Sequence, residues 1–311
     1  MAMNIISGSS NPQLAQKISQ QLSLLCPKQP SHLVPIELTQ FANGEKRVWI
    51  KDPKLVRGQR ICLVQSFSQP VDEHVVETLL IVDALERLGA RGVSLIIPWL
   101  GYSLQDKVFR PGEPIAAKVI ANLISNSFVK RVFLLDLHNS STPGFFSVPT
   151  YHLFADQMFI DYLKELKIDR KQSVIVSPDF GGLKRARVFA QKMDLDMVNI
   201  DKTRDLKTGQ VTAHALHGGS VQGKTAILFD DIVVSGSTVV ESAELLAKAG
   251  AKDIYFLATH GIFCRGWQAI EQSPIKQVVI SNSIVQDQAQ NKKLKILDIS
   301  QLFAEQLVDW L

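Results

Sequence analysis

Six short apolar runs rich in β-branched residues recur along the 311-residue chain, and they limit its fold more than any other feature. They span residues 60–65 (RICLVQ), 92–98 (GVSLIIP), 131–135 (RVFLL), 173–176 (SVIV), 224–229 (KTAILF) and 254–258 (IYFLA). Such runs are typical of strands buried on both faces of a parallel sheet. Helical stretches alternate with them, and residues 73–88 and 239–249 are each followed by a glycine placed as a C-cap. The alternation predicts an α/β fold.

The strand pattern occurs twice. Two apolar strands end in acids that begin a loop, VFLLDLH at residues 132–138 and AILFDDI at residues 226–232. The repetition predicts two similar domains, each a mostly parallel sheet flanked by helices, and a chain of this length suffices for two. We expect an N-terminal domain at residues 1–149 and a C-terminal domain at residues 150–311. Composition does not decide whether residues 280–311 pack back on the first domain.

Charge and cysteine content disfavour several classes of protein. Lys and Arg number 34 against 30 Asp and Glu, and a net charge of +4 favours neither a nucleic-acid groove nor an anionic membrane surface. The three cysteines are far apart and lack CxxC spacing, so we expect buried thiols rather than disulfides or a zinc cluster. No signal-peptide pattern and no run of ~18 apolar residues occurs. These features predict a cytoplasmic protein without membrane or nucleic-acid partners.

Residues 229–238, FDDIVVSGST, join a buried strand to a helix through a loop of small and hydroxyl residues. In a parallel sheet, ligands bind beyond the carboxyl ends of the strands, and a helix N-terminus offers unpaired N–H groups to anions. Gly236 would let the backbone approach a phosphate closely. Ser235, Ser237 and Thr238 could donate hydrogen bonds to it. The loop therefore predicts a phosphate site.

Two adjacent carboxylates, Asp230 and Asp231, precede this loop. Because they would repel a phosphate, sugar hydroxyls or a bound cation are their expected partners. The alternative is an ordinary capped helix start, since acids and Ser or Thr are favoured at N-caps. The segment resembles the signature of the phosphoribosyl-diphosphate-binding fold (type I PRT) of phosphoribosyltransferases and PRPP synthetases. The resemblance implies that the acid pair holds the ribose 2- and 3-hydroxyls and the loop holds the 5-phosphate. Val234 stands where the family most often has an acid or small polar residue.

Residues 41–48 (FANGEKRV) and 98–118 (PWLGYSLQDKVFRPGEPIAAK) resemble the nucleotide-binding segments of ribose-phosphate diphosphokinases, the PRPP synthetases. Phosphoribosyltransferases have no counterpart. The resemblance continues in the family's order at residues 7–18, 68–90, 136–146, 177–186, 201–204, 258–263 and 281–284. It implies two type I phosphoribosyltransferase-type domains. It also implies Mg²⁺-dependent transfer of the diphosphoryl group of ATP to the C1 hydroxyl of ribose 5-phosphate, giving 5-phosphoribosyl 1-diphosphate (PRPP) and AMP for nucleotide biosynthesis.

The resemblance also assigns residues to this reaction, in which positioning and charge neutralisation dominate. His138 and Asp179 match the family's magnesium ligands, although a lone His after a strand is more often structural. Lys202 and Arg204 match the cations that stabilise the transition state. Their spacing can place both on one side of an extended strand, and the polar run at residues 201–210 suits a mobile loop. A solvated charged turn is the alternative.

The ATP contacts that the resemblance implies are Phe41, Asn43, Glu45, Gln105, Asp106 and Lys107. Phe41 would stack on adenine, while Asn43 and Glu45 would hydrogen-bond the base. In the family this hairpin reaches a neighbouring subunit's site, so we expect a homo-oligomer, either a dimer or a hexamer. An exposed Phe on a hairpin is otherwise often plain packing.

The chain departs from the family pattern on the ATP side. Leu104 replaces an arginine near the ATP phosphates, so phosphate binding should weaken unless Lys107, Arg110 or Lys46 compensates. Asn43 replaces an aspartate, but its amide keeps an acceptor. Adenine recognition should therefore survive, while the preferred nucleotide donor stays open.

Further replacements, at Ser141, Pro143 and Tyr151, fall partly in the family's allosteric nucleotide site and predict loss of that regulation. An active PRPP synthetase is the leading interpretation. A non-catalytic paralogue that binds ribose phosphate or nucleotide and regulates a partner enzyme is the second, motivated by Leu104 and Val234. A phosphoribosyltransferase is the third, and it conflicts with the two nucleotide segments.

Overall fold

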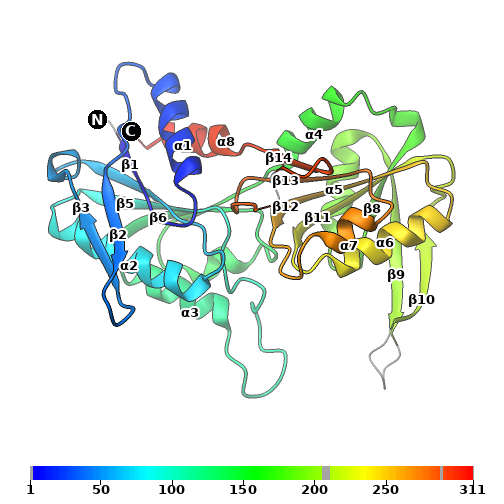
Figure 1. Ribbon diagram of the computed structural model, residues 1–311, viewed down its shortest axis with the longest axis horizontal. Coiled ribbons are helices and arrows are strands. Elements are labelled where there is room, and N and C mark those ends of the chain that lie inside the picture. Colours follow the sequence, from blue (N-terminus) through cyan, green and yellow to red (C-terminus); the bar gives the residue numbers. More distant parts are fainter. Residues whose placement is uncertain (1–2, 205–210, 288–289, 311) are drawn as a thin grey trace. The chain divides into compact units, whose positions relative to one another are not determined.

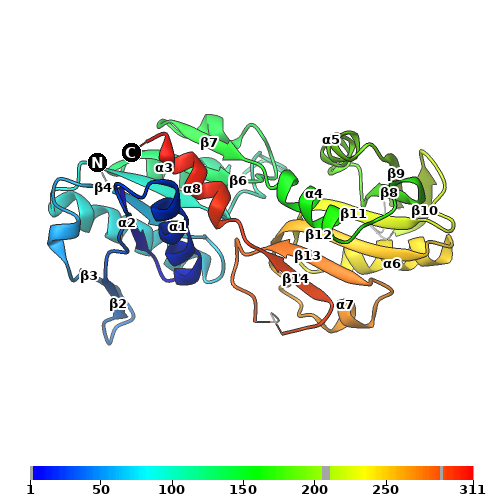
Figure 2. The same ribbon diagram turned by 90° about the horizontal axis from the view of Figure 1, so that it is seen from above.

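The computed structural model of the chain describes residues 3–204, 211–287 and 290–310, with the backbone alone for residues 202–204 and 211–214. It divides into two compact units, each built on one main sheet (Figures 1 and 2). Unit 1 comprises Met1–Phe154, Ser283–Val285 and Asp298–Leu311, and unit 2 comprises Ala155–Asn282 and Gln286–Leu297. These units are defined by contacts within the structure. The predicted boundary between two domains after residue 149 stays a prediction.

Unit 1 contains a parallel five-stranded sheet with the order β1-β4-β5-β6-β7. The strands are β1 (Met3–Ser7), β4 (Arg60–Val64), β5 (Gly92–Ile97), β6 (Val129–Leu135) and β7 (Thr150–Leu153). The helices are α1 (Pro12–Leu25), α2 (Val71–Arg87), α3 (Ala116–Ser125) and α8 (Ser300–Val308), with 3-10 turns at Pro53–Leu55 and Thr142–Phe145. A separate antiparallel hairpin is formed by β2 (Ile36–Gln40) and β3 (Lys46–Ile50). Although α8 is the last helix along the chain, it lies beside α1 (Figure 2).

Unit 2 contains a seven-stranded sheet with the order β10-β9-β8-β11-β12-β13-β14. The strands are β8 (Ser173–Ser177), β9 (Asp196–Arg204), β10 (Val211–His217), β11 (Thr225–Val233), β12 (Asp253–Gly261), β13 (Gln277–Ser281) and β14 (Leu294–Leu297). All neighbours are parallel except β9 and β10, which form an antiparallel pair. The helices are α4 (Asp156–Glu165), α5 (Leu183–Met193), α6 (Ser237–Lys248) and α7 (Gln268–Gln272), with a 3-10 turn at Arg170–Gln172.

Burial explains why the apolar runs become strands. All five residues of β8 are buried, as is the apolar first half of β11, and burying one Val, Leu or Ile side chain stabilises a fold by roughly 1.5–3 kcal/mol. The predicted α/β fold is confirmed. Helices α2 and α6 each begin two residues before the predicted start, and Gly89 and Gly250 follow them with φ of +80° and +83°.

The cysteines match the sequence prediction in part. Cys62 is buried in β4, Cys26 is half-buried and Cys264 is exposed, and all three are free thiols. The expectation of buried thiols is therefore correct for Cys62 and wrong for Cys264, because the latter lies in the loop after β12. Burial raises the pKa of the Cys62 thiol far above its usual value. In the described part of the chain, no helix combines the length and apolarity needed to span a membrane.

Candidate active site

The predicted phosphate loop joins β11 to α6 in unit 2 (Figure 1). Gly236 is the N-cap of α6 and has a φ of +83°, which residues with a side chain rarely adopt; a Cβ there would also lie 2.9 Å from Ile270 Cδ1. Ser235 Oγ and Ser237 Oγ lie 2.9 Å apart, and Ser237 and Thr238 are exposed. Because the cap is glycine, it offers no side-chain acceptor to the N–H groups of the first helical turn. The loop can present N–H and hydroxyl donors to an anion.

The two acids that precede this loop lie inside β11, several residues before α6 begins at Ser237. Since the N-cap is Gly236, the alternative interpretation of Asp230 and Asp231 as helix caps is wrong. Asp231 is 6% exposed, and its N–H donates to Asp230 Oδ1 at 2.8 Å. The acid pair is therefore built into the end of a central strand, where parallel sheets bind ligands.

A third carboxylate, Asp179, lies near this pair. It follows β8, the strand that pairs in parallel with β11, and its Oδ1 accepts a hydrogen bond from the Gly182 N–H at 3.0 Å. A Cβ on Gly182 would lie 3.4 Å from Asp230 Oδ1 and 3.9 Å from Asp179 Oδ1, so this glycine borders both carboxylates. Burial, then the charge of Asp231 and finally that of Asp179, raise the pKa of Asp230 well above its ordinary value.

Neighbouring carboxylates suit a divalent cation, because their mutual repulsion falls when a cation binds. Within residues 3–204, 211–287 and 290–310, no group of three or more His, Cys, Asp or Glu side chains is arranged to hold a metal ion alone. Mg²⁺ usually needs less from a protein, namely one or two carboxylates together with water and substrate phosphates. The carboxylate of Asp179 therefore fits as one ligand of a divalent cation that is shared with a substrate.

In unit 1, the predicted ATP-phosphate segment meets the loop that carries His138. Asn139, the next residue, donates from Nδ2 to Asp106 Oδ2 at 2.5 Å. The Gln105 carbonyl accepts the Ala117 N–H at 3.2 Å, which fixes the segment to the first turn of α3. His138 is exposed. The structure thus brings the segment at residues 105–107 next to the end of β6.

Leu104, which replaces the family's arginine, lies in this segment and is 39% exposed. Of the cations predicted to compensate, Lys46 is held by Glu73, with 2.6 Å between its Nζ and Glu73 Oε2. Lys107 is exposed and its Nζ lies 5.1 Å from the Phe109 ring. Lys107 is therefore better placed than Lys46 to meet a phosphate.

The predicted adenine contacts lie at the turn of the β2–β3 hairpin. Phe41 is 51% exposed, and Asn43 and Glu45 are exposed as well. The Glu45 N–H donates to Asn43 Oδ1 at 3.2 Å, and the Arg47 guanidinium lies 5.8 Å from the Phe41 ring centroid. Half of Phe41 faces solvent, so its ring is accessible, and both its stacking on adenine and plain packing on the hairpin stay open.

Several predicted residues stay untested by this geometry. His138 belongs to unit 1 and Asp179 to unit 2, so their pairing as magnesium ligands remains a prediction. Lys202 and Arg204 lie in the extended strand β9, which suits their spacing. Their side chains, together with residues 205–210, lie outside the described part of the chain.

Sequence reasoning missed two contacts of the site. Gly182 borders Asp179 and Asp230, and the Gly-Gly pair that follows SPDF is a signal that could have indicated a close backbone approach. The contact of Asn139 with Asp106 joins segments 33 residues apart, and no local sequence pattern predicts it.

Fold and site together are those of an α/β protein of the phosphoribosyltransferase type, with a carboxylate pair near the end of one central strand and a loop of anion donors after it. The family model of the N-terminal domain of ribose phosphate pyrophosphokinase matches residues 3–127, and that of the phosphoribosyl synthetase-associated domain matches residues 215–309. The chain belongs to the ribose-phosphate pyrophosphokinase family.

Relatives with curated names support this membership over nearly the full length. A ribose-phosphate pyrophosphokinase of Fusobacterium nucleatum is 38% identical, with 97% of this chain and 93% of the relative covered. One of Bradyrhizobium diazoefficiens is 36% identical, covering 98% and 93%. The crystal structure of phosphoribosylpyrophosphate synthetase from Mycobacterium smegmatis superposes with a TM-score of 0.90 at 29% identity, covering 100% of this chain and 99% of that one.

Proposed function

We propose that the chain transfers the diphosphoryl group of ATP to the C1 hydroxyl of ribose 5-phosphate and releases PRPP and AMP. The observation that carries the proposal is the combined geometry of unit 2, where a glycine-capped helix start follows a strand that ends in an acid pair. Its support is family membership together with relatives named ribose-phosphate pyrophosphokinase. The product would supply nucleotide biosynthesis.

Ribose 5-phosphate would bind at the end of β11. Ser235, Ser237 and Thr238 and the N–H groups around Gly236 would hold the 5-phosphate, because they offer donors at a helix N-terminus. The carboxylates of Asp230 and Asp231 would accept hydrogen bonds from the 2- and 3-hydroxyls. The order of these groups along the chain therefore matches the order of groups along the sugar.

ATP would bind through the unit 1 segments, with Phe41 stacked on adenine and Asn43 and Glu45 bonded to the base. The donors and acceptors for its phosphates would come from Gln105, Asp106 and Lys107. Since Phe41, Asn43 and Glu45 are exposed on their own hairpin, they are available to the site of another subunit. A homo-oligomer, a dimer or a hexamer, follows from this proposal.

The reaction would proceed by in-line attack of the C1 oxygen on the β-phosphorus. Lys202 and Arg204 would stabilise the charge that develops on the transferred and leaving phosphates. His138 and Asp179 would hold Mg²⁺, which supplies neutralisation of the diphosphate charge when bound. Asp230 and Asp231 would orient the sugar so that its C1 hydroxyl faces the nucleotide.

A second candidate function, a non-catalytic paralogue that regulates a partner enzyme, is favoured by two observations. Leu104 faces solvent where the family has an arginine, and Lys46 is held by Glu73 rather than free for phosphate. The paralogue would bind ATP or ribose phosphate without releasing AMP.

Purified protein mixed with ribose 5-phosphate, ATP and Mg²⁺ tests the choice between these functions. The proposed function predicts AMP release that depends on ribose 5-phosphate and falls at least 100-fold in a Lys202→Ala variant, since one transition-state donor is commonly worth ~10²–10³ in rate. AMP release no faster than in that variant would contradict the proposal and favour the paralogue. Repetition with GTP, CTP and dATP would define the nucleotide donor.

A further inference from the structure

The N-terminal half of α2 contacts both unit 1 segments that we propose bind ATP. Three acids lie on it, namely Asp72 and Glu73 in the first turn and Glu77 one turn later. Glu73 and Glu77 contact Lys46, which lies beside the turn of the β2–β3 hairpin, while Asp72 contacts the segment that leads to residues 105–107. One helix end therefore connects two elements that lie far apart in the sequence.

The hairpin is tied to α2 through Lys46, the first residue of β3. Its Nζ lies 2.6 Å from Glu73 Oε2 and 3.9 Å from Glu77 Oε2, and its side chain is 19% exposed. Lys51, the residue after β3, gives a useful contrast. It pairs with Glu37 of β2 at 2.6 Å, and its side chain is 45% exposed. Lys46 thus connects the hairpin to α2, whereas Lys51 connects the hairpin to itself.

Glu77, the deeper of the two partners of Lys46, is fixed by three hydrogen bonds. Its carboxylate accepts the Ser9 N–H at 2.7 Å, the Ser9 hydroxyl at 2.9 Å and Gln65 Nε2 at 2.8 Å. Ser9 follows β1 and Gln65 follows β4, so the network joins α2 to two strands of the sheet. Because the carboxylate is 1% exposed and has several donors, it is held in one orientation. The anchor of the hairpin is therefore part of the core of unit 1.

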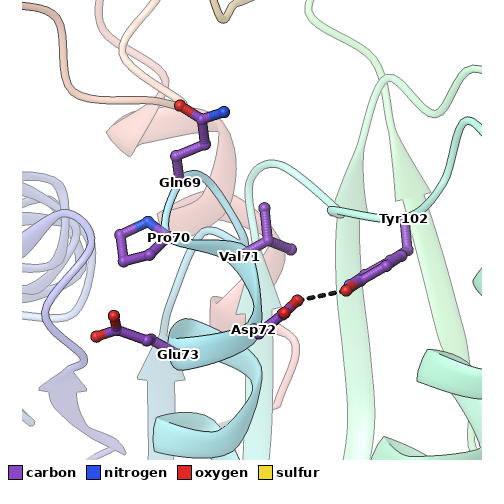
Figure 3. A pocket seen from close by; sticks show the side chains of 6 residues that line it. All are labelled: Gln69, Pro70, Val71, Asp72, Glu73 and Tyr102. Atoms are coloured by element: carbon purple, nitrogen blue, oxygen red, sulfur yellow. Dashed lines mark hydrogen bonds between the residues drawn. The ribbon is translucent and has the colours of Figure 1, made fainter. Parts of the chain in front are cut away.

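The second segment is tied to α2 through Tyr102, whose hydroxyl donates to Asp72. Figure 3 shows the two side chains meeting beside a pocket of about 520 Å³. The hydrogen bond to Asp72 raises the pKa of Tyr102, so the phenol keeps the proton that it donates. Gly101, just before it, lies so close to the chain entering α2 that a Cβ would stand 2.5 Å from the Phe67 carbonyl oxygen. The Gln105 N–H then donates to the Tyr102 carbonyl at 3.2 Å.

We propose that α2 positions both ATP-binding segments, through Glu73 and Glu77 acting on Lys46 and through Asp72 acting on Tyr102. These are positioning residues, since they contact the segments and act on the nucleotide through them. The inference rests on the proposed function, because it takes residues 41–45 and 105–107 as ATP contacts. A hairpin and a loop that are already fixed lose less conformational entropy when ATP binds. Loss of either contact should weaken ATP binding without weakening ribose 5-phosphate binding.

Steady-state kinetics on two variants test whether α2 positions the two segments for ATP. Lys46→Met and Tyr102→Phe each remove one contact and keep most of the side chain. We expect KM for ATP to rise roughly three- to tenfold, while kcat and KM for ribose 5-phosphate stay within about twofold. Lys51→Met and Tyr162→Phe, which loses a hydroxyl hydrogen bond to Gln277 in unit 2, are matched controls that should leave KM for ATP unchanged. An equal rise in both KM values, or no rise for ATP, would overturn the proposal.

Glu73→Gln separates positioning from a direct contact of Lys46 with a phosphate. It removes the partner's charge and leaves the lysine in place. Positioning predicts a higher KM for ATP, and it predicts that Lys46→Met adds little to Glu73→Gln in the double variant, because the two residues act through one contact. A lower KM for ATP in Glu73→Gln would show that Lys46, once released, binds phosphate itself, and would overturn the positioning role.

Hydrogen exchange provides a readout that does not depend on activity. Lys46→Met should speed amide exchange in peptides that cover residues 36–50, and Tyr102→Phe should do so in peptides that cover residues 99–107, relative to the two controls. Unchanged exchange in both would overturn the inference even if the enzyme is active. Faster exchange in a protein that releases no AMP would leave the positioning intact and contradict the proposed function instead.

Discussion

Asp230 is a residue at which binding and stability oppose each other. Burial and the charges of Asp231 and Asp179 raise its pKa, so the folded protein favours the protonated carboxyl more than the unfolded chain does. The stability that this residue contributes is present at low pH and is lost as the pH rises through the raised pKa. The charged form of this carboxylate therefore lowers the free energy of unfolding, and we attribute the retention of an acid here to binding of the sugar hydroxyls.

Asp230→Asn should therefore stabilise the protein while weakening ribose 5-phosphate binding. We expect the free energy of unfolding to rise near pH 8, because a neutral amide avoids the cost of a buried charge beside two other carboxylates. The difference from wild type should shrink as the pH falls through the raised pKa. Urea unfolding at several pH values measures this, with the exposed Asp83→Asn as control. A less stable Asp230→Asn variant near pH 8 would contradict the assignment.

Leu104→Arg tests the ATP side at the same scale. Because Leu104 is 39% exposed, an arginine has room there, and it would add a cation near the proposed phosphate contacts. We expect KM for ATP to fall roughly three- to tenfold, the effect of one charge-assisted hydrogen bond. Leu24→Arg is the control: it adds a cation at an exposed position of α1 and should leave KM for ATP unchanged. An unchanged KM in Leu104→Arg would mean that Lys107 or another cation already serves the phosphates.

Where a candidate site is local, the sequence indicates which residues lie close together. The acids and the donors of the phosphate loop lie within nine positions of each other, so one strand end and one helix start suffice to bring them together. Gly182 and the contact of Asn139 with Asp106 depend on how distant segments pack, and no local pattern encodes that. The contact of Tyr102 with Asp72 was not predicted either, because it also depends on how distant segments pack.

Among elements, those with a simple burial pattern could be predicted. The central strands are apolar on both faces and α2 and α6 end at glycines, so composition and capping suffice. The β2–β3 hairpin has mostly half-buried or exposed residues, and a continuous apolar run is therefore missing. The last residues of β9 were expected in a mobile loop because they are polar, yet residues 199–204 pair with β10.

The turn between β11 and α6 yields a prediction about glycine. Gly236→Ala should lower the free energy of unfolding by roughly 1–3 kcal/mol, because its left-handed φ and the nearby Ile270 side chain both disfavour a Cβ. KM for ribose 5-phosphate should rise as the loop shifts. Gly223→Ala is the matched control, since Gly223 also has a positive φ, +71°, with nothing within 4 Å of the added carbon.

Calorimetry and kinetics on both glycine variants measure these effects. Equal destabilisation of the two proteins would mean that backbone strain alone acts and that the crowding against Ile270 is unimportant. An unchanged KM for ribose 5-phosphate in Gly236→Ala would argue against a phosphate at this loop.

In the whole molecule, the proposed site residues are divided between the two units. The adenine hairpin, residues 105–107 and His138 belong to unit 1, whereas Asp179, β9 and the phosphate loop belong to unit 2. Residues 298–310 return to unit 1 after the whole of unit 2, with α8 beside α1. Composition alone could not predict this return, because it is decided by packing between helices at opposite ends of the chain. The proposed ATP contacts therefore belong to unit 1, and the proposed ribose 5-phosphate contacts belong to unit 2.

Phosphorus NMR of one reaction mixture shows most directly whether the chain makes PRPP. With ribose 5-phosphate, ATP and Mg²⁺, we expect PRPP and AMP to appear in equal amounts as ATP disappears, and both to form at least about 100-fold more slowly with Lys202→Ala. Persistence of ATP, or its conversion to ADP without PRPP, would mean that the chain does not make PRPP.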